Sequence, residues 1–337
     1  MFQNANPESL NSFTKKELMT HLNQQATLEN DTDLENLGAK LNIHTLQWNN
    51  TVHFDLTYTP WKHLGYKLAV ASLTPHLAKG LLPDYLLLNI TTSSKYSLDA
   101  LEELVIGFFT ACKAYKCKAR LTDVTTSAVG ISMNTTAINT QLPVQSPFTS
   151  PEFNTGDLIC VSGDLGGAYL GLMLLEREKR VFKENPEMQP DLEGKDYIVG
   201  KQLKPHLRTD VIEHIKNEGI KLNSSFGLQN GLAKGILPYF TDNEHGAVLH
   251  EDKLPVDTET MMQAIDFGID PTVAVLDGGE DYELGFIIPQ SEYEKLQKLS
   301  QFITVIGYVS DQTSDVLMQF KSGKTFPLTE LKFGEGN

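Results

Sequence analysis

Long apolar runs, paired cysteines and an excess of basic residues are all missing from this sequence of 337 residues. No stretch reaches the roughly 18 uninterrupted apolar residues that a membrane span requires, so we expect no spanning helix. The three cysteines, Cys112, Cys117 and Cys160, form neither a CxxC pair nor a zinc-site spacing. An odd number of unpaired cysteines is typical of reduced, buried thiols, which makes a disulfide-stapled secreted domain a poor interpretation.

The charge balance excludes a further class of partner. A formal net charge of -15 argues against nucleic acid, because binding to a phosphate backbone needs a concentrated basic surface. Residues 1–30 contain no basic segment followed by an apolar run, so a secretory signal is not supported and we expect a cytoplasmic protein. With 40% hydrophobic and 21% charged residues, the chain has the composition of a folded globular protein.

Strand and helix patterns alternate along the chain, which indicates a mixed α/β and α+β architecture. Residues 140–155 hold three prolines among polar residues and read as a linker. We therefore expect an N-terminal domain over 1–145 and a C-terminal domain over 152–337. The patterns predict helices over 7–24, 60–79, 98–115, 165–182, 209–218, 230–240, 258–267 and 291–299, and strands over 41–48, 85–91, 117–122, 129–138, 158–161, 282–288 and 303–309.

A glycine turn at 162–167 joins a predicted strand to a predicted helix. Such a turn can offer backbone N–H groups to a phosphate, because glycine permits close approach and a helix N-terminus attracts anions. It matches neither GxxxxGK[ST] nor GxGxxG, so a structural turn in which Asp164 caps the helix is the stronger interpretation.

Several polar residues stay open between a binding role and a structural one. Glu280 and Asp281 lie in a glycine turn before a predicted strand, where carboxylates can grip a ligand or satisfy the donors of the turn. His53 can contact a phosphate or be a buried structural histidine. The acidic run 29–35 lacks the spacing of a calcium loop and reads as a solvated surface.

Five segments together resemble the thiamine-monophosphate kinase family. They are VHFDLTYTPWKHLGYK at 52–67, the predicted helix over 98–115, VSGDLGGAYLGL at 161–172, QLKP at 202–205 and GGEDYEL at 278–284. The resemblance implies an aminoimidazole-ribonucleotide-synthetase-like fold, with an N-terminal sheet domain that forms a homodimer and a C-terminal α+β domain. It further implies a site for ATP, Mg²⁺ and thiamine phosphate, with His53, Glu280 and Phe333 on the substrate side.

The family's metal-binding carboxylates are mostly replaced. Residues 121–125 stand where the family has its GGDTT motif. By resemblance, Asp123 in this segment is the catalytic and metal-binding residue, and Thr122 contacts the nucleotide. Glu29 and Asp31 are weaker metal candidates. The other aligned positions carry residues without a carboxylate, namely Leu46, Pro75, Gly227 and Asn230.

Three functions follow from this pattern. The first is a family homologue with weak or lost catalysis that still binds thiamine phosphate or a related ligand. The second is an active kinase with a magnesium site rebuilt around Asp123, since phosphoryl transfer depends on charge neutralisation by metal ions. The third is a non-catalytic protein that binds a partner. We favour the first, because the replacements fall on the metal and nucleotide half.

Overall fold

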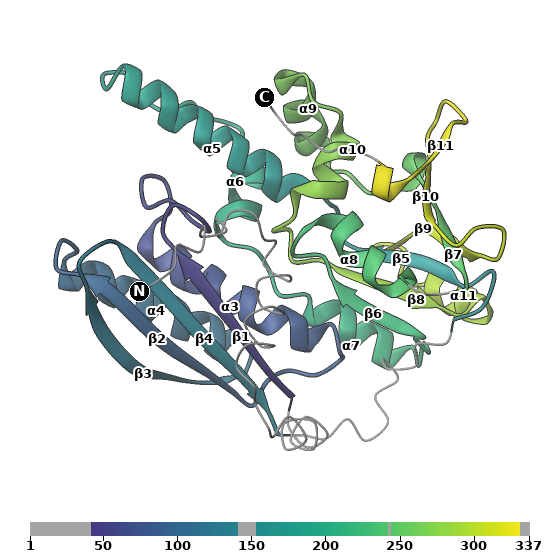
Figure 1. The fold of residues 1–337 in the computed structure, drawn as a ribbon, viewed down its shortest axis with the longest axis horizontal. Coiled ribbons are helices and arrows are strands. Elements are labelled where there is room, and N and C mark those ends of the chain that lie inside the picture. Colours follow the sequence, from purple (N-terminus) through teal and green to yellow (C-terminus); the bar gives the residue numbers. More distant parts are fainter. Residues whose placement is uncertain (1–41, 141–152, 242–243, 331–337) are drawn as a thin grey trace, which may run out of the picture.

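The computed structural model describes residues 42–140, 153–241 and 244–330 and arranges them around two sheets. The first sheet has the strand order β1-β4-β2-β3, formed by β1 (Asn42–Asn49), β2 (Tyr85–Ser93), β3 (Lys118–Ser127) and β4 (Ile131–Asn139). Its strands pair antiparallel except β2 and β3, which are parallel. Figure 1 shows helices α3 (Trp61–Leu77) and α4 (Leu98–Ala114) packed against one face of this sheet.

The two helices of the first sheet approach each other closely because each carries a glycine at the crossing. A Cβ added at Gly65 of α3 would lie 1.9 Å from the Leu104 carbonyl oxygen of α4, and one at Gly107 would lie 1.9 Å from the Lys62 carbonyl oxygen of α3. Backbone packed against backbone leaves no room for a methyl group. This contact fixes the position of α3, which carries residues of the site described below.

The second sheet has the strand order β11-β10-β7-β9-β5-β8-β6. Its strands are β5 (Leu158–Ser162), β6 (Ser224–Gly227), β7 (Gly246–His250), β8 (Leu284–Ile288), β9 (Ile303–Ser310), β10 (Val316–Gln319) and β11 (Thr325–Pro327). Only β7 and β10 pair in parallel. The surrounding helices are α5 (Gly167–Glu184), α6 (Asp196–Leu203), α7 (Thr209–Asn217), α8 (Gly231–Phe240), α9 (Thr258–Phe267), α10 (Pro271–Val273) and α11 (Tyr293–Gln297), with short helical turns η2 (Glu251–Lys253), η3 (Ala274–Gly278), η4 (Gln290–Glu292) and η5 (Leu328–Glu330).

Both faces of the second sheet are covered by apolar side chains. In β8, Leu284 and Phe286 point into a core shared with the first sheet, and Ile287 points into a separate core with α8. This alternation follows from the period of two in a strand. The shared core contains residues of both sheets, so segments that are distant in the sequence come together there, and Figure 1 shows the two sheets in one molecule with helices between them.

The predicted mixed α/β fold class is confirmed, and most predicted elements lie within a few residues of the observed ones. The predicted strand over 282–288 begins instead at Leu284, because Tyr282 has a φ of 54° that an extended strand cannot contain. Helices α6 and α10 and strands β6, β7, β10 and β11 were not predicted. The predicted helix over 7–24 and most of the predicted linker lie outside the described residues.

Within the described residues, no helix combines the length and apolarity needed to cross a bilayer.

Candidate functional site

A cleft of about 660 Å³ lies between the first sheet's helix α3 and helices α5 and α6 of the second part. His53, from the loop after β1, and Glu280, from the turn before β8, both line it. These two residues are far apart in sequence and were both predicted to contact substrate. The structure therefore brings the two candidates into one cavity.

Glu280 is held by donors from both halves of the chain. Lys67 of α3 and Gln202 of α6 each donate to Glu280 Oε2, at 2.9 Å in both cases. The Lys67 side chain is only 6% exposed, whereas that of Glu280 is 29% exposed. A buried ammonium needs a partner, so Glu280 is the counter-ion of Lys67 as well as part of the cleft wall.

The turn at 279–282 directs consecutive side chains to different places. Glu280 and Tyr282 have φ values of 63° and 54°, a region that side chains other than glycine rarely adopt. As a result Glu280 faces the cleft, Asp281 faces the start of α5 and Tyr282 is buried in the shared core. Such backbone strain persists where the surrounding structure fixes it, and it clusters at functional sites.

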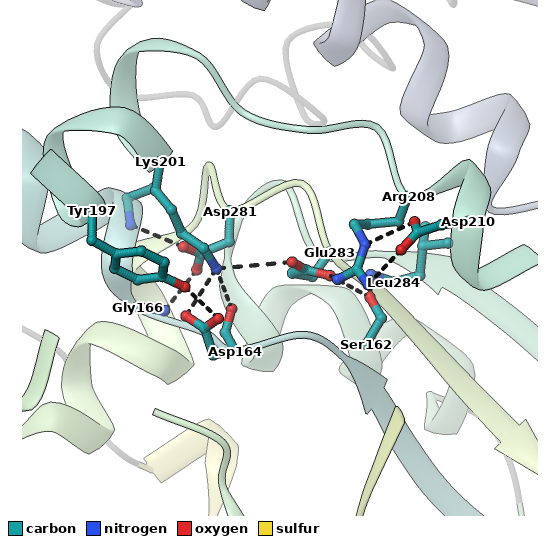
Figure 2. A network of polar contacts seen from close by, with 11 residues as sticks. Ser162, Asp164, Gly166, Tyr197, Lys201, Arg208, Asp210, Asp281, Glu283 and Leu284 are labelled. Carbon is teal, nitrogen blue, oxygen red and sulfur yellow. Dashed lines mark hydrogen bonds and ion pairs between the residues drawn. The ribbon is translucent and has the colours of Figure 1, made fainter. Parts of the chain in front are cut away.

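Asp281, rather than Asp164, caps helix α5. Its carboxylate accepts hydrogen bonds from Gly166 N at 2.7 Å and from Ala168 N at 2.9 Å. The predicted cap by Asp164 is wrong, because that carboxylate pairs with Lys201 and Tyr197 (Figure 2). Burial raises the pKa of Asp281 to about 6, although Lys201 and the two backbone donors act to lower it. The donors that could have met a phosphate here already hold a carboxylate of the protein.

A buried ionic network continues from Asp281 towards β5, as Figure 2 shows. Glu283 accepts from Arg208 Nη1 at 2.6 Å and from the Ser162 hydroxyl, and Lys201 Nζ lies 3.8 Å from its other oxygen. Burial raises the pKa of Glu283, with Arg208 and Lys201 opposing the shift. A neighbouring cavity of about 740 Å³ opens beside this network. Two of the cations that line this cavity, Lys201 and Arg208, pair with carboxylates of the network.

The lining of the cleft also includes a second set of paired charges. Lys179 of α5 donates to Asp55 at 2.7 Å and to Glu176, and the Tyr58 hydroxyl also donates to Glu176 at 2.7 Å. Burial alone would raise the pKa of Asp55, but hydrogen bonds from Lys179 and Thr57 lower it to about 2. These contacts tie the loop that carries His53 to α5.

His53 is oriented by its own loop. Its Nδ1 accepts a hydrogen bond from Asn49 N at 3.1 Å, so the neutral ring carries its proton on Nε2. The ring lies nearly parallel to Trp48, with centroids 6.5 Å apart. One nitrogen is thus committed to the backbone.

Asp123 and Thr122, which were predicted to bind metal and nucleotide, lie away from this cleft. Asp123 is exposed on β3, and Thr122 donates to Leu88 O and Asn89 Oδ1; neither lines this cleft. Glu29, Asp31 and Phe333 lie outside the described residues. Among the predicted metal residues the structure describes Asp123 alone, and it does not bring Asp123 to the cleft of His53 and Glu280.

The aligned metal positions were tested for their fit to a magnesium ion. The segments 71–75 and 227–230 meet, since Gln229 Nε2 donates to Ala71 O and a Cβ on Gly227 would lie 3.4 Å from Thr74. Neither segment carries a carboxylate at the contact. Over residues 42–140, 153–241 and 244–330, no three His, Cys, Asp or Glu side chains gather closely enough to hold a metal. At the aligned positions, the described residues therefore offer a magnesium ion no cluster of carboxylates.

Sequence reasoning missed Lys67, Gln202 and Lys179 as parts of the cleft. Lys67 and Gln202 belong to two of the segments that carried the family resemblance, and this was the available signal. Helix α5 lines one wall of the cleft with residues that recur at helical spacing, namely Leu172, Glu176, Lys179 and Lys183. That spacing did not indicate that Asp55 and Glu280, from other segments of the chain, line the same cleft.

Comparison with known proteins covers almost the whole chain, although no family model matches it. The thiamine-monophosphate kinase of Aquifex aeolicus (strain VF5) is 25% identical over 296 residues, covering 87% of this chain and 91% of the relative. The thiamine-monophosphate kinase of Buchnera aphidicola subsp. Acyrthosiphon pisum is 25% identical over 319 residues, covering 90% of each chain.

Solved structures give the same result. The Aquifex aeolicus thiamine monophosphate kinase structure aligns with a TM-score of 0.69 at 25% identity, covering 86% of this chain and 90% of that one. The hydrogenase maturation protein HypE of E. coli shares the fold alone, with a TM-score of 0.66 at 17% identity over 90% of each chain. In both sequence and structure, the chain is therefore similar over almost its whole length to thiamine-monophosphate kinases.

Proposed function

We propose that the cleft lined by His53 and Glu280 binds thiamine phosphate or a closely related phosphate ester, and that kinase activity is weak or lost. The observation that carries this proposal is the meeting of His53 and Glu280 in one cavity. A solved relative, described as "AaThiL complexed with AMPPCP and TMP", aligns over 95% of this chain with a TM-score of 0.75. Its bound compounds make thiamine phosphate the first ligand to test.

The charges of the cleft suit a ligand that is cationic at one end and anionic at the other. The lining includes the lysines Lys67, Lys179 and Lys183 and the carboxylates Asp55, Glu176 and Glu280. Thiamine phosphate carries a cationic thiazolium ring and a phosphate monoester. A cleft of mixed charge can pair with both groups, whereas a purely basic one would favour the phosphate alone.

The replaced carboxylates support the loss of catalysis. When bound, Mg²⁺ and ATP would supply the transferring phosphoryl group and neutralise its charge. Leu46 and Pro75 offer no side-chain ligand to a cation, and Asn230 offers only a neutral oxygen. Asp123 is the remaining described carboxylate among the aligned positions. A kinase rebuilt around Asp123 is the competing outcome, and loss of product in Asp123→Asn would identify it.

We further propose a division into domains near residues 145–152 and a homodimer formed through the first sheet. Support for the dimer comes from Ile43 and Tyr85 on that sheet and Val124 on its edge strand β3, which are all exposed. Light scattering coupled to gel filtration would test it. A mass of one chain at micromolar concentration would contradict the dimer and leave the ligand site unaffected.

The ligand proposal is tested by calorimetric titration of thiamine phosphate without ATP into the wild type, His53→Ala and Glu280→Gln. Loss of a hydrogen bond to a charged group corresponds to a roughly 10- to 100-fold weaker affinity, which we expect for Glu280→Gln. Glu294→Gln, an exposed glutamate on α11, is the matched control and should bind like the wild type. No heat of binding for thiamine phosphate, thiamine or thiamine pyrophosphate would overturn the proposal in favour of a partner-binding protein.

A further inference from the structure

We propose that Gln202 is a positioning residue that, together with Lys67, fixes the Glu280 carboxylate so that Oε1 meets the cationic or N–H-bearing end of the ligand. This inference rests on the proposed ligand site and assigns a role to a residue outside the predicted set. Gln202 lies in the last turn of α6 and lines the same cleft.

The orientation of the Gln202 amide follows from its partner. Because an ionised carboxylate only accepts hydrogen bonds, the nitrogen of the amide must face Glu280. Gln202 Nε2 and Lys67 Nζ both lie 2.9 Å from the same oxygen, Glu280 Oε2. Two donors from different helices therefore hold one oxygen, Oε2, of a carboxylate whose side chain is 29% exposed and lines the cleft.

In the part of the chain that the structure describes, this arrangement leaves the amide oxygen of Gln202 without a hydrogen-bond partner. Gln202 is a buried residue, and its Oε1 has no hydrogen-bond partner among the described residues. A leucine of similar volume would avoid a buried acceptor without a partner, which is ordinarily costly. The amide is therefore explained by what Nε2 does for Glu280, and not by the stability of α6.

The position of Gln202 is set by close packing between α5 and α6. A Cβ on Gly171 of α5 would lie 2.2 Å from Ile198 O and 3.1 Å from Gln202 Cβ. Helix α6 thus lies directly on α5, and Gln202 has little freedom to follow a moving Glu280. A donor held rigidly in place orients its acceptor with little loss of entropy on binding.

The test compares Gln202→Leu with Gln263→Leu, each combined with thermal denaturation. Gln263 is a matched control, because it is buried on α9 with both amide atoms unpartnered in the described structure, and it does not line the cleft. We expect Gln202→Leu to melt no lower than the wild type and to bind thiamine phosphate about tenfold more weakly. Gln263→Leu should also keep its melting temperature and should bind like the wild type.

A double-mutant cycle separates positioning from a general structural effect. If Gln202 acts through Glu280, Gln202→Leu should change the affinity by less than about twofold in a Glu280→Gln background, because the carboxylate that it orients is gone. Unphosphorylated thiamine should lose the same factor as thiamine phosphate, and binding of inorganic phosphate should not change.

The outcomes distinguish this inference from the function beneath it. Equal affinities of the wild type and Gln202→Leu, with thiamine phosphate still bound, would overturn the positioning role alone. A tenfold loss that persists in the Glu280→Gln background would also overturn it. Absence of any binding by the wild type would overturn both proposals.

Discussion

Arg208 and Glu283 form a buried ion pair whose loss can be predicted in size and in pH dependence. Arg208 Nη1 lies 2.6 Å from Glu283 Oε2, and the side chains are 14% and 6% exposed. Replacing Arg208 with methionine leaves the Glu283 carboxylate with the Ser162 hydroxyl and with Lys201 at 3.8 Å. Breaking a buried pair by removing one partner costs about 3 to 5 kcal/mol. The contacts of Arg208 with half-exposed Asp210 add at most about 1 kcal/mol.

The loss of unfolding free energy caused by Arg208→Met should change with pH in a predictable direction. Burial already raises the pKa of Glu283, and removal of Arg208 takes away a contact that opposes the rise. An acid with a raised native-state pKa contributes stability below its unfolded-state pKa and loses it as pH rises through the native-state value. The deficit relative to the wild type should therefore be largest near pH 8 and should shrink towards pH 5.

Urea denaturation between pH 5 and pH 8 measures both effects. Arg180→Met is the matched control, since Arg180 is exposed on α5, and it should change the free energy of unfolding by less than about 0.5 kcal/mol. A loss of unfolding free energy in Arg208→Met below about 1 kcal/mol at pH 8, or one that does not vary with pH, would contradict the predicted role of this ion pair.

Three further predictions concern the fold and its charges. Gly65→Ala and Gly107→Ala should each lower the free energy of unfolding by at least about 1 to 3 kcal/mol. Gly200→Ala, with no atom within 4 Å of the new methyl group, should be neutral or stabilising; equal melting temperatures for all three would contradict the close approach of α3 and α4. Because burial raises the pKa of Asp281 from 3.8 to about 6, its native form favours the proton, so the stability of Asp281→Asn relative to the wild type should rise by up to about 3 kcal/mol from pH 4 to pH 7. Denaturation curves showing no such change over that range would count against it. Millimolar Mg²⁺ should leave the melting temperature unchanged, and a clear rise would reveal a metal site that the described residues do not form.

Regular, strongly patterned elements could be predicted from the sequence. Helix α9 was predicted at its observed bounds, since Asp257 caps its start and Gly268 ends it in the left-handed region. Short elements could not be predicted in the same way. Strand β6 has four residues and α6 has eight, too few for a period to stand out, and their place depends on pairing with β8 and packing on α5.

The site was predictable only where a motif named it. His53 and Glu280 came from the family resemblance, and the structure places both in one cleft. The partners of Glu280 were missed because they are 213 and 78 residues away in sequence. Asp164 was predicted to cap α5 because it is adjacent, whereas the observed cap, Asp281, arrives from a turn 115 residues further on. The sequence around the start of a helix does not indicate which distant carboxylate will accept hydrogen bonds from its N–H groups.

The most direct test of the central claim is chromatographic detection of thiamine pyrophosphate. A high concentration of this protein would be incubated with thiamine phosphate, ATP and Mg²⁺, beside the Aquifex aeolicus thiamine-monophosphate kinase as a positive control. We expect little or no product while the control converts its substrate fully. Product at a rate near that of the control, abolished in Asp123→Asn, would contradict it and would identify an active kinase with a rebuilt metal site.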